Sequence, residues 1–201
     1  IADMTYLTRL IAAAALALAA PTAAVADADL ERVSAYLNGL KTAQGTFLQA
    51  NNDGSVSSGT YYISKPGLMR FDYAPPVPAV VISDGWWVAV VDRASNADPQ
   101  RYPLVSTPLN LILQDDVDLT DEDMVQAVNR EAGLIRITAL DPDRPEIGTI
   151  ELVFRDNPLA LAEWIVTNEA GERTNVLLSD MVRDVSIPRR RFSIEAAVID
   201  R

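Results

Sequence analysis

The sequence of 201 residues contains no histidine and no cysteine. Their absence excludes histidine general acid–base catalysis, Ser-His and Cys-His nucleophiles, and the common zinc and copper sites. No glycine-rich phosphate-binding motif is present either. A Ser-Lys pair or two carboxylates could still support an enzyme, but lysine occurs only at Lys41 and Lys65. We therefore expect no enzyme and no cofactor, with a cofactor-free serine hydrolase as the open alternative.

The acidic segment 115–123 is the one candidate for metal binding, because it holds six acidic residues in nine positions. A calcium loop of the EF-hand type needs Gly at its sixth position and Glu at its twelfth. Counted from Asp116, these positions hold Asp121 and Ala127. The pattern fails, so we interpret the segment as a solvated acidic loop without a metal ion.

The first part of the chain resembles an export signal. Arg9 is followed by the apolar run Ile11–Ala20 and then by the small residues Ala24-Val25-Ala26. This pattern predicts a secretory signal peptide over 1–26, cleaved after Ala26, and the run is shorter than the ~20 residues that span a bilayer. A buried alanine-rich helix is the alternative. We expect a single mature domain over 27–201, located in the periplasm, and the net charge of −11 argues against nucleic acid as a partner.

A hairpin over 57–76 is the clearest structural signal. Pro66-Gly67 predicts a type II turn, and apolar residues alternate with polar ones on both sides of it. Further turn signals follow at intervals of 8–12 residues along the chain. We count about ten or eleven antiparallel strands, which favours a mainly β sandwich or barrel.

Two helices accompany these strands. Asp29 is a candidate N-cap for an amphipathic helix with Leu30, Val33, Leu37 and Leu40 on one face. We expect Gly45 to end this helix and Thr46 to begin the first strand. A second, short and very apolar helix is predicted over 107–113, either as a lid over a cavity or as an ordinary core helix. Strands 79–82 and 86–91 are apolar on both faces, so we expect something to cover their second face.

Several motifs together resemble the periplasmic outer-membrane lipoprotein carrier family, LolA. Each motif is weak alone, but their order covers nearly the whole mature chain. They are Gly45–Gln49, Gly59–Gly67, Arg70–Tyr73, Ser83–Gly85, Thr107–Leu109, and Trp164–Thr167 followed by Gly171 and Thr174.

The resemblance implies a strongly curved, unclosed antiparallel β-barrel with covering helices over an apolar cavity for the acyl chains of lipoproteins. It also implies an inner-membrane ABC-type release complex and an outer-membrane receptor lipoprotein as partners, and a monomeric carrier. The family's receptors are anchored through a lipidated N-terminal cysteine, so a sequence without cysteine resembles the carrier. A periplasmic protein that binds other lipids or apolar ligands is the alternative function.

The resemblance also indicates a latch between the sheet and its lid. In many carriers an arginine precedes the proline of the first hairpin and hydrogen-bonds to the covering helices. Lys65 stands at that position here, and it lacks the planar guanidinium fork. We therefore consider Lys65 as the latch and Arg70 as a possible substitute. A solvated surface lysine is the alternative for Lys65.

The residues that we expect to line the cavity are the large apolar ones on the strands and the lid. Because alternate residues of a strand face opposite ways, an error of one residue in register would reverse an assignment. The expected lining residues are Phe47, Tyr61, Ile63, Phe71, Tyr73, Trp86, Trp87, Leu109, Ile112, Phe154 and Trp164.

Overall fold

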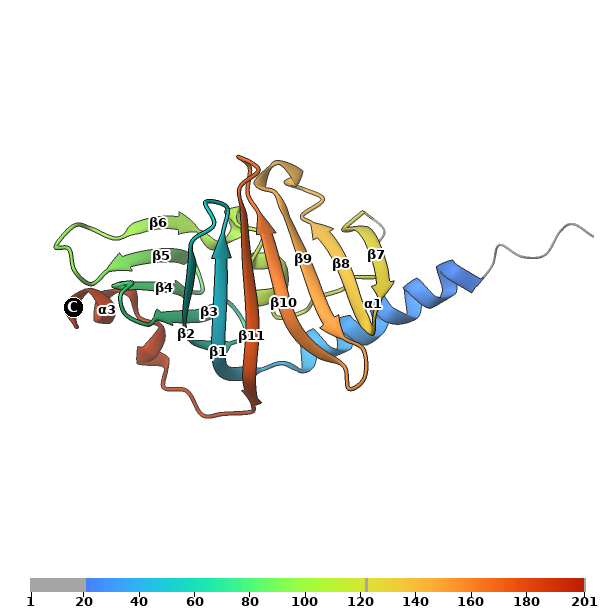
Figure 1. Ribbon diagram of the computed structural model, residues 1–201, viewed down its shortest axis with the longest axis horizontal. Helices are drawn as coiled ribbons and strands as arrows, with labels where there is room; N and C mark the ends of the chain where they lie inside the picture. The colour runs from blue at the N-terminus through green and yellow to red at the C-terminus, as the bar shows by residue number, and fades with distance from the viewer. Residues whose placement is uncertain (1–20, 122, 201) are drawn as a thin grey trace, which may run out of the picture.

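The computed structural model describes residues 21–121 and 123–200. This part of the chain holds eleven strands in one antiparallel sheet, three α-helices and three short 3₁₀ segments (Figure 1). In chain order they are α1 (Pro21–Gly39), β1 (Thr42–Asn51), β2 (Val56–Ser64), β3 (Leu68–Tyr73), β4 (Ala79–Asp84), β5 (Trp87–Asp92), β6 (Gln100–Pro103), η1 (Leu104–Ser106), α2 (Asn110–Leu113), β7 (Val125–Glu131), β8 (Leu134–Leu140), η2 (Pro145–Ile147), β9 (Thr149–Arg155), β10 (Ala160–Thr167), β11 (Arg173–Arg183), η3 (Arg189–Phe192) and α3 (Ile194–Ile199).

The sheet is open, with the strand order β6-β5-β4-β3-β2-β1-β11-β10-β9-β8-β7. The two edge strands β6 and β7 do not pair with each other, so the barrel does not close. Strands β4–β6 run nearly across the direction of β1 and β11, which shows how strongly the sheet curves (Figure 1). The predicted mainly β, unclosed architecture is confirmed.

The turns that the sequence predicts lie where strands meet, with one difference in detail. Asn51–Gly54 joins β1 to β2, and Asp84-Gly85 joins β4 to β5. In the hairpin of β2 and β3, Gly67 has the expected positive φ of 76°. The Lys65–Pro66 peptide bond is cis, a detail that the sequence did not predict.

Helix α1 buries the predicted stripe, because Leu30, Val33, Leu37 and Leu40 all lie in the main core. Its predicted limits are wrong. The helix begins at Pro21, so Asp29 lies within it rather than at its N-cap. It ends at Gly39, and Gly45 lies inside β1. A Cβ at Gly45 would lie 2.5 Å from the main-chain oxygen of Ser179, so close strand packing, not helix termination, requires the glycine here.

The two faces of the sheet carry different covers. We call the face under α1 and α2 the inner face, and it bears the main hydrophobic core. On the other, outer face, Ile194 and Ala197 of α3 pack against apolar side chains of β4 and β5. The predicted cover over the second face of these two strands is therefore confirmed, and the C-terminal helix provides it.

The predicted acidic loop is only partly solvated. Val117 and Leu119 are buried in the main core, and their main-chain N–H groups donate to Asn38 and Ser34 of α1. The loop thus fastens to the helix through its apolar residues. Among the described residues, no acidic cluster has the arrangement of a metal site, and no helix is long and apolar enough to cross a membrane.

Candidate functional site

The inner face brings nine of the eleven predicted lining residues into one hydrophobic cluster. Most are fully buried, while Tyr73 and Leu109 pack against the cluster at its margin. Phe71 lies at the centre of the aromatic contacts, with its ring 4.7 Å from that of Phe47 and 5.9 Å from those of Tyr61 and Trp164. The nine residues are Phe47, Tyr61, Ile63, Phe71, Tyr73, Leu109, Ile112, Phe154 and Trp164.

Trp86 and Trp87 do not belong to this cluster, so their place in a cavity lining stays a prediction. Their exposed fractions are 80% and 43%. The Asp84 carboxylate accepts hydrogen bonds from both main-chain N–H groups, at 2.9 Å each, and holds the turn that carries them outside the core. Trp87 also shares its side of β5 with Ala89, which packs on the outer face. Apolar and polar residues do not alternate in this strand, so the sequence does not show which of its residues face the core.

The covering helices meet the sheet at the hairpin of β2 and β3. Helix α2 is only four residues long, and Thr107 does not cap it, since its hydroxyl donates to the Leu104 oxygen instead. Its buried Leu111, Ile112 and Leu113 nevertheless close part of the inner face. The main-chain N–H of Gly67 donates to the Leu113 oxygen at 2.8 Å, so the hairpin holds the end of α2.

Lys65 links the same hairpin to α1. Its Nζ donates a hydrogen bond of 3.0 Å to the main-chain oxygen of Leu37, in the last turn of the helix. The residue is only 9% exposed, so the solvated surface lysine is excluded. Burial, assisted by the charge of Lys41, lowers the pKa of Lys65 from 10.5 to about 8. The contact therefore stabilises the ammonium group less than water does, and it makes a weak attachment.

Arg70 lies elsewhere. Its Nε and Nη2 donate to the carboxylate of Asp72, and its Nη1 donates to the Arg191 oxygen in η3. The Arg191 guanidinium carbon lies 4.2 Å from the centre of the ring of Tyr62, on the neighbouring strand β2. Arg70 thus fastens the C-terminal segment to the outer face and has no recorded contact with α1 or α2.

A second attachment of α1 was missed by the sequence analysis. Arg130 of β7 donates through two nitrogens to the buried carboxylate of Asp29. A third nitrogen of Arg130 donates to Asp156, which also accepts from Arg32. Hydrogen bonds from Arg130 and Arg32 lower the pKa of Asp156, and those that Arg130 donates to Asp29 and Asp156 raise the pKa of Arg130. No local sequence pattern predicts this network, because Asp29, Arg130 and Asp156 are far apart in the sequence.

The Tyr61 hydroxyl is buried in the cluster without a hydrogen-bond partner in the described structure. Burial raises the pKa of Tyr61, with smaller contributions from Tyr36 and Asp180. Buried polar groups in folded proteins nearly always have a partner. The Tyr61 hydroxyl is therefore available to donate a hydrogen bond to an oxygen atom of a bound molecule.

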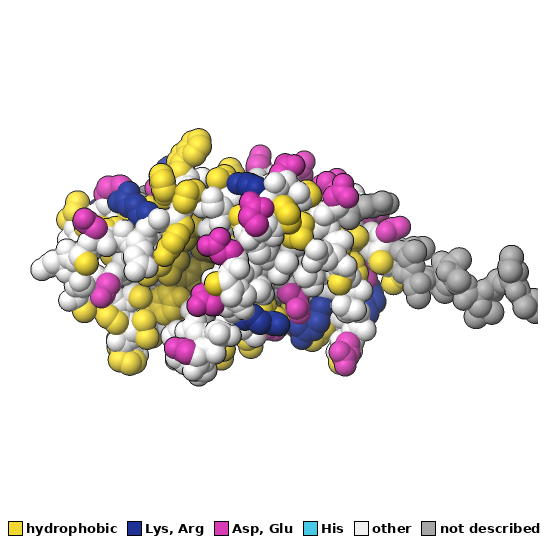
Figure 2. Space-filling model, turned by 90° about the horizontal axis from the view of Figure 1, so that it is seen from above, with side chains coloured by type: hydrophobic (Ala, Val, Ile, Leu, Met, Phe, Trp, Pro, Cys, Tyr) yellow, Lys and Arg dark blue, Asp and Glu magenta, His cyan; other side chains and the backbone are white. Residues whose placement is uncertain are grey.

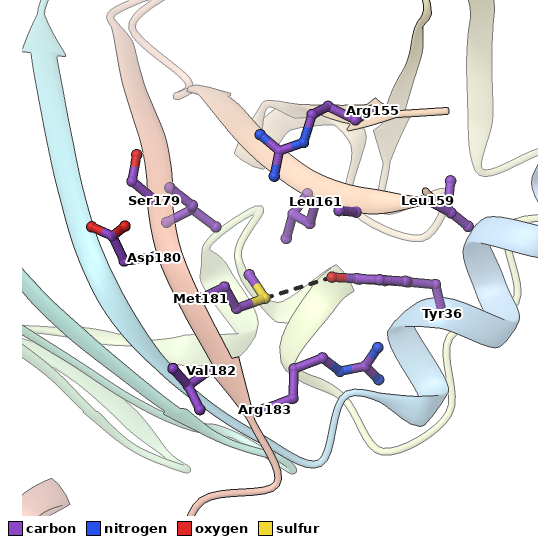
Figure 3. Close-up of a pocket in the computed structure, with 11 residues that line it drawn as sticks. Tyr36, Arg155, Leu159, Leu161, Ser179, Asp180, Met181, Val182 and Arg183 are labelled. Atoms are coloured by element: carbon purple, nitrogen blue, oxygen red, sulfur yellow. Dashed lines mark hydrogen bonds between the residues drawn. The ribbon is translucent and has the colours of Figure 1, made fainter. Parts of the chain in front are cut away.

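The chain also has a pocket with a volume of about 580 Å³ between α1 and strands β10 and β11 (Figure 3). Tyr36 covers it from the helix, and its hydroxyl lies 3.5 Å from the sulfur of Met181. In the space-filling view, hydrophobic side chains also line a hollow over the half of the molecule that holds β4–β6 (Figure 2). Apolar surface is thus accessible from more than one side.

Comparisons with known proteins agree with this architecture. Residues 38–195 match the family described as outer membrane lipoprotein carrier protein LolA. An outer-membrane lipoprotein carrier protein of Chromobacterium violaceum is 28% identical over 190 residues, which cover 90% of this chain and 89% of that protein. One from Methylibium petroleiphilum is 29% identical over 188 residues, covering 89% and 90%.

Solved structures show the same fold at lower sequence identity. The crystal structure of a DUF1329 family protein from Desulfovibrio piger has a TM-score of 0.52 and 12% identity, covering 86% of this chain and 98% of that one. The family match covers well over half of the sequence, and the two carriers align over nearly their full lengths. The chain therefore belongs to the LolA family of outer-membrane lipoprotein carrier proteins, a family of transport proteins rather than enzymes.

Proposed function

We propose that this protein is a periplasmic carrier that binds the acyl chains of lipoproteins between the inner face of its sheet and helices α1 and α2. The observation that carries the proposal is the hydrogen bond from Lys65 to Leu37, which links the hairpin of β2 and β3 to α1 beside the apolar core. Family membership supports outer-membrane lipoproteins as the cargo. The unpaired Tyr61 hydroxyl offers a donor to a carbonyl oxygen of that cargo.

The energetics explain why the lid must be weakly held. Burying one methylene group contributes about 0.8 kcal/mol, so a ~15-carbon acyl chain represents on the order of 12 kcal/mol. A lipoprotein would cross water too rarely without a carrier. The carrier must recover much of this free energy and still release its cargo. This requirement favours a core that the helices cover when no cargo is bound and that lid movement opens.

The remaining parts of the proposal are suggested by the resemblance to this family and by the export pattern of the sequence. The carrier would accept lipoproteins from an ABC-type release complex in the inner membrane and deliver them to a receptor lipoprotein in the outer membrane, acting as a monomer. The export signal over 1–26 would be removed, leaving the domain 27–201. The apolar run of this signal lies outside the described residues, while its last six residues fall within α1.

The test compares Lys65→Met with Lys41→Met. Both variants replace a lysine by a side chain of similar length, but Lys41 is exposed and its ammonium group lies 3.7 Å from the carboxylate of Asp115. The purified proteins are loaded with a fluorescent lipoprotein, and its transfer to receptor-bearing membranes is followed at equal loading. We expect slower transfer for Lys65→Met, because a side chain without charge costs nothing to bury and holds the lid more firmly.

Lys41→Met removes only the smaller influence of the Lys41 charge on Lys65, so it should slow transfer much less than Lys65→Met does. If Lys65→Met leaves both transfer and acyl affinity unchanged, Lys65 is not the latch. If the wild type binds a fluorescent fatty acid but no lipoprotein, the protein is a carrier of other lipids instead.

A further inference from the structure

Four exposed apolar side chains lie at one corner of the sheet, where β5 begins and β6 ends (Figure 1). Trp86 lies in the turn before β5, and its main-chain oxygen accepts a hydrogen bond of 2.8 Å from the Leu104 N–H, directly after β6. Trp87 begins β5 and pairs with the last residue of β6. Tyr102 and Val105 are 51% and 49% exposed. We call Trp86, Trp87, Tyr102 and Val105 the aromatic corner.

The aromatic corner is a projecting rim rather than a groove. Trp87 shares its side of β5 with Ala89, which packs on the outer face. Tyr102 lies opposite Val88, which packs in the core of the inner face, and residues opposite each other on paired strands share a face. Aromatic side chains therefore stand on both sides of the edge strand. Protein–protein hot spots usually fit into pockets, whereas a projecting wedge suits a fluid lipid surface.

The turn that carries the two tryptophans is held in one conformation. The Asp84 carboxylate accepts hydrogen bonds from the main-chain N–H groups of both Trp86 and Trp87, and Gly85 between them has a positive φ of 102°. Side chains on a fixed turn lose less conformational freedom on binding than side chains on a mobile loop. The aromatic corner is therefore arranged for contact before any partner arrives.

The corner is uncharged within a strongly acidic chain. Neither 85–91 nor 102–114 contains a charged residue, although the net charge of the chain is −11. Arg101 of β6 lies 3.7 Å from Glu195, so this pair adds no net charge. Trp and Tyr are the residues that gather at membrane–water interfaces, where their rings lie at the level of the head groups. Because the acidic chain is repelled by anionic lipid, an uncharged lipid surface complements this corner best.

The corner is also joined to the elements that cover the core. A Cβ at Gly67 would lie 2.8 Å from the Cα of Gly85, so the turn of the tryptophans packs on the hairpin of β2 and β3. The N–H of Gly67 donates in turn to the Leu113 oxygen at the end of α2. Leu104, which donates to Trp86, begins the segment that leads into α2. A surface bound at the corner therefore lies next to the junction of this hairpin with α2.

We propose that the aromatic corner is a membrane-contact surface, which places Trp86 and Trp87 in the interfacial layer of a zwitterionic lipid bilayer. The contact brings the junction of the hairpin with α2 to the lipid, where the acyl chains of a released cargo would insert. This consequence for delivery rests on the proposed function, whereas the contact itself requires no cargo. Such binding is shallow and reversible, because its strength scales with the small apolar area that is buried.

The experiment uses the whole, empty protein and vesicles of phosphatidylcholine with brominated acyl chains. Bromine quenches tryptophan emission only at short range, so Trp86 and Trp87 should be quenched while Trp164, buried in the core, is not. We expect the protein to sediment with these vesicles and to lose part of its emission. An equal mixture of phosphatidylcholine and phosphatidylglycerol should bind more weakly, because its anionic lipid repels a chain with a net charge of −11.

Two double variants complete the test. Trp86→Thr with Trp87→Thr should bind the phosphatidylcholine vesicles at least about tenfold more weakly than the wild type. The matched control is Leu48→Thr with Leu177→Thr, which removes two exposed apolar side chains that lie opposite each other on β1 and β11. This control should bind like the wild type. Equal quenching in the wild type and in the tryptophan variant would assign the signal to Trp164 and overturn the inference.

Uptake of a fluorescent acyl probe in the absence of vesicles separates this inference from the proposed function. A wild type that takes up the probe but binds no vesicles rejects the membrane contact and leaves the proposed function intact. Vesicle binding by a protein that takes up no probe supports the membrane contact and rejects the proposed function. If the wild type ignores pure lipid while the tryptophan variant slows transfer to receptor-bearing membranes, the corner contacts the receptor protein and the lipid contact is overturned.

Discussion

Arg130 on β7 and Asp29 on α1 form a two-pronged ion pair in which two guanidinium nitrogens bind both oxygens of one buried carboxylate. Lys65 binds the same helix eight residues further on, at Leu37. Eight residues correspond to about 12 Å along an α-helix. Helix α1 thus has a charged attachment to the sheet at Asp29 and a weaker one at Leu37. We expect it to open from the Lys65 end while the Arg130 end acts as a hinge.

The first prediction concerns this hinge. Arg130→Gln leaves the buried Asp29 carboxylate without its main partner, which is costly. We expect amide hydrogen exchange of the α1 residues from Asp29 to Tyr36 to become at least about tenfold faster, and the melting temperature to fall. The double change Arg130→Gln with Asp29→Asn should recover part of both losses, because no buried charge is left. Unchanged exchange in the single variant would show that the ion pair does not hold the helix.

The second prediction concerns the unpaired hydroxyl of Tyr61. In the empty protein this group has no partner to lose, so Tyr61→Phe should keep or raise the free energy of unfolding. If the hydroxyl donates to a cargo carbonyl, the affinity for lipoprotein should fall about two- to tenfold, the usual net value of one hydrogen bond. Denaturant unfolding and fluorescent binding assays measure the two effects. The matched control is Tyr73→Phe, whose hydroxyl already donates to Gln49. A Tyr61→Phe variant that is less stable when empty contradicts the assignment.

The third prediction uses the three tryptophans as reporters. Trp164 is 2% exposed and contacts Phe71 in the core, whereas Trp86 and Trp87 are exposed. Acylated cargo should change the emission of Trp164 alone. In a variant with both exposed residues changed to Phe, the cargo-dependent fluorescence change should persist in full. Its loss there, together with its survival in Trp164→Phe, would place the cargo outside the core.

Much of the fold could be predicted because its signals are local. The turn residues at Asp84-Gly85 and the stripe Leu30–Leu40 depend only on neighbours a few positions away, and both were assigned correctly. Lys65 was also placed correctly at the hairpin, since a proline follows it and fixes an extended backbone. These features need no knowledge of the remote parts of the chain.

The errors arise where distant segments meet. Gly45 resembles a helix end in the sequence, yet the Ser179 oxygen across the sheet explains it. Asp29 resembles an N-cap, but Arg130, 101 residues away, determines its role. Trp86 and Trp87 are the kinds of residues that cores use, yet both are exposed, and Trp87 lies on the side of β5 that bears Ala89. The pocket under Tyr36 depends on a bulge in β11, and no local sequence pattern predicts this bulge.

The fourth prediction concerns the proposed cleavage after Ala26. The first α1 residue with a recorded side-chain contact to the sheet is Asp29, so a chain that begins at Asp27 keeps the Arg130 and Lys65 attachments. A protein spanning 27–201 should therefore have the same melting temperature as one spanning 21–201, within about 2 °C. Calorimetry of the two purified proteins measures this. A clear loss of stability would mean that residues 21–26 belong to the folded domain.

The last prediction concerns the pH dependence of the lid. With the lid closed, burial lowers the pKa of Lys65 to about 8, and exposure to water on opening should return it toward 10.5. Between these values the open state holds one more proton than the closed state, so each rise of one pH unit should favour closure by up to about tenfold. Below pH 8 both states carry the charge, and the opening equilibrium should be insensitive to pH.

The rate at which a fluorescent acyl probe enters the empty protein measures this equilibrium. For the wild type we expect a constant rate from pH 6.5 to 7.5 and a progressive fall from pH 8 to 9.5. Lys65→Met has no proton to exchange at this position, so its rate should stay flat across the same range. Lys41→Met should keep the fall but move it to higher pH, because the charge of Lys41 helps to lower the pKa of Lys65. An equal fall in wild type and Lys65→Met would assign the pH dependence to another group and remove Lys65 from control of the lid.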